Sequence, residues 1–469
     1  MQSGTPFPPR VFFAAALALA MISTGVAEPP PGAMVTALDT YVATPDASYK
    51  YTVEKTLKEE SYTAYIVRMQ SQTWLTPDKV DRTAWIHDLE VIVPKKVRSE
   101  VGLLFIGGGA NERDVPDSVN SELAKIAVAS GSVVTELGQV PNQPLTFKDD
   151  PDKRARTEDA LIAFTWDQFL KGGDASGLAR LPMTKSAVRA MDTITEVCQK
   201  EAQISVKQFV VAGGSKRGWT TWTTAAVDKR VKAIVPIVID MLNVRASFQH
   251  HYQAYGFFAP AVDDYVEAGI MEWQDTPRYG ELLKVVEPYE YRSRFTMPKL
   301  LLNATGDQFF LPDSSQFYFN DLPGEKYLRY VPNADHGLKG SDAYETLLGY
   351  YALILADAAR PKFSWNSPGE GKLAVKVDDK PATVKLWQAS NPNARDFRKD
   401  TIGKAWKSTV LKPDDKGSYT VDVPKPKKGW TAFMIELTYD TAAKIPIKLT
   451  TNVEVTPRAL PFPPFKPKR

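Results

Sequence analysis

The stretch VVAGGSKRGW at residues 210–219 decides the fold. Val210 to Ala212 continue an apolar run that is typical of a buried strand, and Gly213-Gly214 break it sharply. Ser215 stands at the break, and the pattern that follows predicts a helix. Such a turn needs small residues and places the serine at a helix N-terminus, whose amides favour developing negative charge. A phosphate loop of the G-x-x-x-x-G-K-[ST] type does not fit the spacing.

Strands and helices alternate on both sides of this turn. The nearly all-apolar run VGLLFIGGG at 101–109 predicts a strand covered on both faces, and further strands follow up to residue 331 with helical patterns between them. This alternation predicts an α/β fold with a parallel sheet between two layers of helices. Residues 49–94 alternate with period two, which predicts antiparallel strands ahead of the parallel ones.

Three further segments complete the predicted domain organisation. Residues 1–27 have the order of a signal peptide, with Arg10, a short apolar block and small residues up to Ala27. Residues 28–360 form the α/β domain, interrupted at about 240–296 by an aromatic, helical insertion expected to lie over the sheet as a cap. Residues 361–469 show short alternating runs and predict an all-β domain, an Ig-like β-sandwich with a Pro/Lys-rich tail.

Composition excludes several classes of function. The chain of 469 residues is 43% hydrophobic, so it can bury a sizeable core, and its net charge of +3 is too small and scattered for a nucleic-acid partner. Its one cysteine, Cys198, excludes an intrachain disulfide and lies without metal-ligand spacing. We expect no cofactor, no metal and no stable membrane span after signal cleavage. The expected partner is a small-molecule or peptide substrate, and the oligomeric state is left open.

A serine, an acid and a histidine follow three different strands in that order. Ser215 follows the strand ending at Ala212, Asp307 follows PKLLLNATG, and His336 follows LRYVPNAD. Functional groups gather at the carboxyl ends of strands in an open α/β sheet, and this is the order of the α/β-hydrolase triad. Histidine suits the base role because its pKa lies near neutrality, and the acid would orient it.

Other residues compete with or support this set. Asp313 is the rival acid, but it reads as the N-cap of the next helix, whereas Asp307 directly follows a strand. The glycine-rich turn at Gly108, Gly109 and Ala110 predicts backbone amides that bind an oxyanion.

The two cations after the serine, and two histidines in the insertion, each allow two interpretations. Lys216 and Arg217 oppose the helix dipole, so they either face water or bind substrate or oxyanion. His250 and His251 lie in the insertion without acidic ligands at clear spacing, which favours an aromatic lid wall over a metal site.

Several motifs carry a family resemblance. The segments LLFIGGGAN, RTEDALIAFTW, LPMTKSAVRAMD, GGSKRGWTTW, NATGDQFFLPDSS and VPNADHG resemble the PhoPQ-activated pathogenicity-related proteins, from about residue 45 through ARDFR. The resemblance implies an exported bacterial α/β-hydrolase with Ser215, Asp307 and His336 as its triad, and implies no substrate. The elbow G-x-S-x-x-G is also similar to that of glucuronoyl esterases, which by analogy gives Lys216 a role at the oxyanion.

The sequence thus predicts a periplasmic or secreted serine hydrolase that cleaves an ester or peptide acyl bond. The physiological context that the family resemblance implies is envelope stress or virulence. A peptidase acting on N-termini would need acids to hold the amine, and Glu112, Glu158 or Asp159 could serve. The alternative is an inactive α/β-hydrolase scaffold that acts as a binding protein.

Overall fold

A single large β-sheet organises the protein. The computed structural model describes residues 1, 35–441 and 444–469. Among these, a 14-stranded sheet runs in the order β1-β2-β3-β5-β4-β8-β9-β10-β11-β18-β17-β14-β15, with β19 paired to β17. Its strands up to β11 are β1 (Lys50–Lys58), β2 (Tyr62–Thr73), β3 (Ala84–Pro94), β4 (Val101–Ile106), β5 (Val134–Leu137), β8 (Gln208–Gly214), β9 (Val231–Ile237), β10 (Lys299–Ala304) and β11 (Lys326–Val331).

The sheet is antiparallel at its N-terminal edge and parallel in its centre. β1, β2, β3 and β5 pair antiparallel in turn, as the period-two pattern predicts. From β5 through β4, β8, β9 and β10 to β11 every pairing is parallel. The carboxyl ends of β8, β10 and β11, which precede the three candidate catalytic residues, therefore meet at one edge of the sheet.

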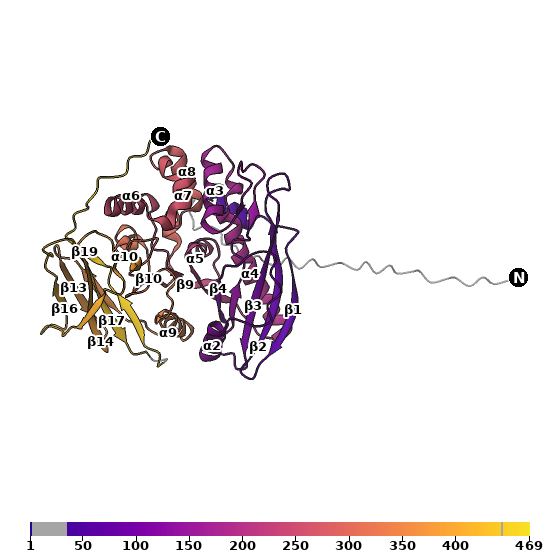
Figure 1. The fold of residues 1–469 in the computed structure, drawn as a ribbon. Coiled ribbons are helices and arrows are strands. Elements are labelled where there is room, and N and C mark those ends of the chain that lie inside the picture. Colours follow the sequence, from indigo (N-terminus) through magenta and orange to yellow (C-terminus); the bar gives the residue numbers. More distant parts are fainter. Residues whose placement is uncertain (2–34, 442–443) are drawn as a thin grey trace.

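Helices cover both faces of this sheet (Figure 1). Val211 of β8 packs into the core with α3, α4 and α5, whereas its neighbours Val210 and Ala212 pack into the core with α2 and α9. This alternation of buried side chains explains the continuous apolar run in the sequence. The helices are α1 (Ala37–Ala43), α2 (Ser121–Ser130), α3 (Glu158–Leu170), α4 (Arg180–Val197), α5 (Lys216–Val227), α6 (Val244–Tyr255), α7 (Asp263–Glu267), α8 (Pro277–Val286), α9 (Ala343–Leu355) and α10 (Lys399–Ile402).

The insertion predicted at about 240–296 lies between β9 and β10 and is helical. It contains α6, α7 and α8 and three short 3₁₀ turns, at Pro260–Val262, Ile270–Trp273 and Pro288–Arg294. Figure 1 shows α6, α7 and α8 above the carboxyl ends of the central strands. α7 packs against α3, so the insertion is tied to the helical layer that contains α3.

The C-terminal segment is built of strands, as predicted, but most of these strands continue the large central sheet. β18 pairs antiparallel with β11 at Leu328 and Thr450, which covers the edge that β11 would otherwise expose. A second sheet, β12-β13-β16, shares a buried core with β14 and β17. The strands are β12 (Phe363–Asn366), β13 (Lys372–Val377), β14 (Thr383–Asn391), β15 (Lys407–Val410), β16 (Tyr419–Asp422), β17 (Trp430–Tyr439), β18 (Ile447–Thr450) and β19 (Glu454–Thr456).

The predicted signal peptide, residues 1–27, lies outside the described residues apart from Met1. Within the described part of the chain, no helix has the length and hydropathy needed to cross a bilayer.

Candidate active site

The turn at Ser215 has the strained geometry that its sequence predicts. Ser215 has φ 57° and ψ −124°, a conformation that a non-glycine residue rarely adopts. A Cβ at Gly213 would lie 2.8 Å from the Arg217 carbonyl oxygen, and one at Gly218 would lie 2.8 Å from a methyl group of Ile239. Both glycines are therefore required so that α5 can start directly against β8. Ser215 itself stays bound to the sheet through its amide, which donates to the Ile237 carbonyl at 2.8 Å.

The structure pairs His336 with Asp307. The Nδ1 atom of His336 lies 2.8 Å and 3.0 Å from the two carboxylate oxygens of Asp307. One of those oxygens also accepts hydrogen bonds from the amides of Phe309 at 2.8 Å and Phe310 at 3.3 Å, so the carboxylate is fixed. The Phe309 ring packs on the imidazole, with centroids 4.3 Å apart. This arrangement orients the imidazole and leaves its Nε2 atom for another partner.

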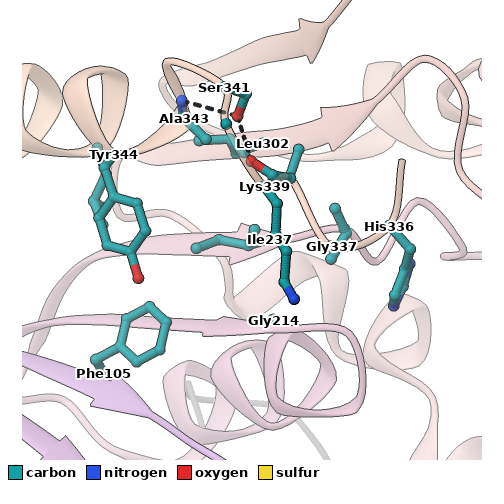
Figure 2. Close-up of a pocket in the computed structure, with 14 residues that line it drawn as sticks. Phe105, Gly214, Ile237, Leu302, His336, Gly337, Lys339, Ser341, Ala343 and Tyr344 are labelled. Atoms are coloured by element: carbon teal, nitrogen blue, oxygen red, sulfur yellow. Dashed lines mark hydrogen bonds between the residues drawn. The ribbon is translucent and has the colours of Figure 1, made fainter. Parts of the chain in front are cut away.

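Ser215 and His336 each line a cavity, and the two cavities are lined by adjacent residues of the chain, Gly214 and Ser215. A cavity of about 390 Å³ is lined by His336 and by Gly214, the residue before the serine. A smaller one of about 30 Å³ is lined by Ser215 and by Phe309, the ring stacked on His336. Figure 2 shows His336 at one end of the larger cavity and Phe105 with Tyr344 at the other. Among the described residues, no hydrogen bond joins the Ser215 hydroxyl to His336.

The cations after the serine are buried and paired with acids. The Lys216 ammonium lies 2.8 Å from Glu158 and 3.0 Å from Asp159 at the start of α3. Arg217 binds the same Glu158 through two hydrogen bonds of 2.7 Å and 2.6 Å. Burial alone would raise the pKa of Glu158, but the hydrogen bond from Arg217 and the charge of Lys216 lower it to about 2.

This network changes two sequence-based interpretations. Neither Lys216 nor Arg217 faces water, because their side chains are only 7% and 12% exposed. Glu158 and Asp159 hold these cations, and Glu112 pairs with Arg82, so each of the acids considered for a substrate amine already has a cationic partner. Lys216 lines the small cavity beside Ser215, and its oxyanion role stays a prediction.

The predicted oxyanion turn lies next to the serine turn. β4 pairs with β8 so that Ile106 stands opposite Gly213, and Gly108, Gly109 and Ala110 follow directly. The Gly108 carbonyl accepts from the Gln139 amide at 2.8 Å, which fixes the turn. A Cβ at Gly108 would lie 2.6 Å from the Arg217 guanidinium, so a larger residue there would require the end of that side chain to shift. The amides of this turn are placed beside the elbow, and their role stays a prediction.

One residue of the small cavity was not foreseen. Arg180 at the start of α4 is 4% exposed and lines the cavity with Ser215. Its guanidinium lies 4.4 Å from the Trp219 ring centroid and donates to the Lys216 carbonyl at 3.0 Å. In the described part of the chain its Nε atom has no hydrogen-bond partner and no carboxylate forms an ion pair with it. No sequence signal distinguishes it from Lys185 and Arg189, the two other buried cations of the same helix.

Asp313 belongs to a second buried cluster. Its carboxylate lies 3.0 Å and 3.1 Å from the Nε2 atom of His250 and 2.5 Å from Arg395. Asp313 does occupy the position before the short 3₁₀ helix Ser314–Phe317, but its side chain makes no cap hydrogen bond. The predicted N-cap position of Asp313 is thus confirmed, but its carboxylate binds His250 and Arg395 instead of the helix amides.

The neighbouring His251 is part of the insertion's aromatic packing. It lies 4.9 Å from the Tyr255 ring centroid and accepts a hydrogen bond from the Ala259 amide at 2.9 Å. Burial lowers the pKa of His251 to about 3, so the ring is neutral and can accept that bond. Within the described residues, no cluster of three or more potential metal ligands occurs.

Fold and site together define a class. A mixed sheet with a parallel centre, a serine at a strained strand-to-helix turn and an Asp–His pair after two later strands are features of the α/β-hydrolase fold, and the three residues follow the order of its triad. The chain belongs to the PhoPQ-activated pathogenicity-related protein family, whose sequence model matches residues 38–398.

Known proteins of similar sequence or structure were found as well. The chain is 38% identical over 456 residues to autocrine proliferation repressor protein A of Dictyostelium discoideum, covering 91% of this chain and 92% of that protein. Among solved structures, it is similar to an acetyl xylan esterase from Paenibacillus sp. R4, with a TM-score of 0.48, 15% identity and coverage of 68% and 92%. Acetyl xylan esterase 1 from Thermoanaerobacterium sp. JW/SL YS485 gives a TM-score of 0.46, 14% identity and coverage of 71% and 96%.

Proposed function

We propose that this protein is a serine hydrolase that cleaves an acyl ester. The observation that carries the proposal is the Asp307 carboxylate 2.8 Å from Nδ1 of His336, at the same sheet edge as the strained Ser215. A carboxylate in that position holds the imidazole in the tautomer whose Nε2 atom accepts a proton. The strained serine conformation directs the hydroxyl away from the sheet, where an acyl carbon can approach it.

The reaction has two steps, the acylation of Ser215 and the hydrolysis of the acyl-serine. The Ser215 hydroxyl oxygen attacks the acyl carbon while its proton passes to Nε2 of His336, and the carbonyl oxygen becomes an oxyanion. Amides of the turn at Gly108–Ala110 and the amide after Ser215 stabilise that oxyanion. The tetrahedral intermediate collapses, and the alcohol leaves with the proton from His336. Water then attacks the acyl-serine while its proton passes to His336. The bond between the acyl carbon and the Ser215 oxygen breaks, His336 returns the proton to that oxygen, and the acid is released.

The ion pairs around the elbow favour an ester over the N-terminus of a peptide. A peptidase of the latter kind needs a free carboxylate for the substrate amine, and Glu158 and Asp159 both bind Lys216. The charged side chains that line the small cavity are two cations and one carboxylate, Arg180, Lys216 and Asp159. A substrate ammonium there would meet like charge, which disfavours its binding.

The proposal is tested by fluorophosphonate labelling of the purified protein. We expect labelling of the wild type and none of Ser215→Ala or His336→Ala, because only an activated serine reacts. Ser130→Ala, at the end of α2 away from the catalytic edge, is the matched control and should label normally. A wild type that is folded by circular dichroism but does not label would contradict the proposal.

A second candidate function is a binding protein on an inactive hydrolase scaffold. One observation favours it, since no hydrogen bond joins Ser215 to His336 among the described residues. Catalytic hydrogen bonds are often long before substrate binds, so this observation alone does not outweigh the complete residue set. The labelling experiment separates the two functions.

We propose further that residues 1–27 export the protein to the periplasm or the medium, in a bacterium that uses it in envelope physiology. The support is the order of charge, apolar block and small residues in that segment. Intact-mass measurement of protein from the periplasmic fraction should show a chain starting at about residue 28. A full-length chain confined to the cytoplasm would contradict this.

A further inference from the structure

A strongly basic cavity lies where the hydrolase sheet meets the C-terminal strands. Its volume is about 360 Å³, and it is lined by residues of β11, β14, β17 and β18 and of the loop after His336. Six cations and two carboxylates line it: Arg329, Lys339, Lys385, Lys399, Lys404 and Lys448, with Asp342 and Glu436. The whole chain carries a net charge of only +3, so positive charge is concentrated in this basic cavity.

The two carboxylates are already used by other cations of the basic cavity. Arg329 is 1% exposed and pairs with Glu436 and, at 2.8 Å, with Asp342. Lys448 pairs with Asp342 at 2.5 Å.

Lysines without an acidic partner remain in the basic cavity. Lys399 pairs with Asp335 at 2.8 Å. Within the described residues, Lys339, Lys385 and Lys404 have no carboxylate within ion-pair distance. The ammonium groups of Lys385 and Lys404 thus create a positive potential in the basic cavity that attracts anions, while the side chain of Lys339 extends toward Gly214.

An aromatic ring accompanies these lysines. Trp387 of β14 lines the basic cavity and is half-buried. In the described part of the chain its indole Nε1 is buried and has no hydrogen-bond partner. Because this atom is shielded from solvent, a bound sugar would contact the accessible part of the indole ring and not its N–H group. The combination of cations and an indole ring fits an acidic sugar better than a simple inorganic anion.

The basic cavity shares a wall with the cavity at the active site. Lys339, Gly340 and Ser341 line both cavities, and His336 and Gly214 line the one at the active site. Figure 2 shows the Lys339 side chain directed toward Gly214 between Ile237 and His336. The loop after His336 therefore carries positive charge from the reacting groups to the basic cavity.

We expect the departing alcohol of the ester to lie on the side of Ser215 where His336 and the basic cavity are found. His336 returns the proton to the departing alcohol, so the alcohol must lie next to the histidine, which lines the cavity of about 390 Å³. The cavity of about 30 Å³ on the other side of Ser215 has room only for a small acyl group. The alcohol part of the substrate thus lies toward Lys339 and the basic cavity beyond it.

We infer that the basic cavity binds a carboxylate- or phosphate-bearing sugar on the alcohol side of the ester. Lys385 and Lys404 bind the anionic groups, and Trp387 packs against the ring. The inference rests on the proposed function for the direction of the substrate, but binding in the basic cavity can be measured without any reaction.

The test is calorimetric titration of the Ser215→Ala protein at low salt with three probes: trigalacturonate, inorganic phosphate and the neutral xylotriose. We expect saturable binding of trigalacturonate, weakened at least tenfold by Lys385→Gln/Lys404→Gln and by 0.5 M NaCl. Binding of phosphate but not trigalacturonate would assign a phosphate-bearing alcohol to the same site. Binding of neither anion, or equal binding of xylotriose, would overturn the inference.

The matched control is Lys407→Gln/Lys412→Gln. Both lysines are exposed in the same C-terminal segment, neither lines the basic cavity, and the change in net charge is the same. This control should bind trigalacturonate as the parent does. An equal loss in the control would show general charge attraction and would overturn the site.

A kinetic comparison links the site to the reaction. Acetylated polygalacturonate and acetylated xylan are given to the enzyme with an intact Ser215. Lys385→Gln/Lys404→Gln should raise KM for the acidic polymer at least fivefold more than for the neutral one. A protein that binds trigalacturonate but shows no serine labelling would remove the proposed hydrolase function and leave the anion site standing.

Discussion

Within the described residues, two aspartates six positions apart in the chain each pair with a histidine, and the two Asp–His pairs differ in three ways. Asp307 contacts Nδ1 of His336, whereas Asp313 contacts Nε2 of His250. The His336 side chain is 19% exposed and that of His250 is 8% exposed, although each of them lines a cavity. Asp313 also binds Arg395, while among the described residues no lysine or arginine pairs with Asp307.

These differences separate a reactive pair from a structural one. Asp307 leaves Nε2 of His336 available to move a proton, as general acid–base catalysis requires. Asp313, in contrast, contacts the Nε2 atom of His250, and the buried guanidinium of Arg395 compensates the charge of Asp313. A carboxylate next to a histidine is thus not enough for a catalytic assignment. The nitrogen that it contacts and the charge around it decide the role.

The largest expected effect comes from Asp307→Asn. The amide removes the charge that stabilises the imidazolium and permits the wrong tautomer, so kcat on p-nitrophenyl acetate should fall by about 10³–10⁴-fold. The amide oxygen can still accept the amides of Phe309 and Phe310, so the loop should keep its shape. Steady-state kinetics with circular dichroism checks this. A fall of less than tenfold would assign the catalytic acid elsewhere.

Asp313→Asn should act on stability instead. Arg395, which is 4% exposed, would lose its carboxylate and remain buried as an uncompensated charge. Such a loss costs about 3–5 kcal/mol in the free energy of unfolding. Urea denaturation at pH 7 measures it, and kcat per folded molecule should stay within a few-fold of the wild type.

The double variant Asp313→Asn/Arg395→Met sharpens this test. Removing the guanidinium as well should restore part of the lost stability, because the uncompensated charge is gone. An Asp313→Asn protein as stable as the wild type but with kcat reduced a thousandfold would reverse the assignment of the two pairs.

Much of the hydrolase core was predictable from the sequence, because the patterns that indicate it lie within short segments of the chain. The apolar runs, the glycines at 213 and 218 and the order of Ser215, Asp307 and His336 are all properties of short segments. Asp307 was preferred over Asp313 because it directly follows a strand, and that residue is the one that contacts His336. Element type and strand ends are what periodicity reports best.

The contacts that define the second pair could not be predicted. His250 lies 63 positions before Asp313 and Arg395 lies 82 positions after it, and no periodicity relates such distant segments. The pairing of β18 with β11 likewise depends on one bridge between Leu328 and Thr450. The sequence showed two cations after Ser215, but only the fold brings Glu158 to both of them.

The Asp313 carboxylate should also make the free energy of unfolding depend on pH. Burial alone would raise the pKa of Asp313, but the charges of Arg395 and His250 hold it well below its usual value of 3.8. The unfolded chain therefore takes up a proton at this site below about pH 4 while the folded chain does not. The stability that Asp313 contributes is present above that pH and is lost as the pH falls.

Urea denaturation between pH 5 and pH 3 measures the contribution of Asp313 to the free energy of unfolding. One extra proton bound on unfolding steepens the wild-type curve by about 1.4 kcal/mol per pH unit, and Asp313→Asn should lack that slope. Equal slopes in the two proteins below pH 4 would show that this carboxylate has an ordinary pKa in the fold.

The smallest effect comes from the rings that pack on each histidine. Phe309 lies against His336 with centroids 4.3 Å apart, and Phe317 meets His250 edge-on at 5.0 Å. An aromatic pair contributes about 0.5–1.5 kcal/mol, so loss of the ring should loosen the imidazole without removing any reacting group. Phe309→Leu should therefore lower kcat by about 2–10-fold.

Phe317→Leu is the matched change at the other pair. It should leave kcat unchanged and lower the unfolding free energy by about 1 kcal/mol, because it packs on a histidine that moves no proton. Steady-state kinetics and urea denaturation of both variants give the two readouts. If Phe317→Leu lowered kcat as much as Phe309→Leu, the two Asp–His pairs would be coupled, and His250 could no longer be treated as purely structural.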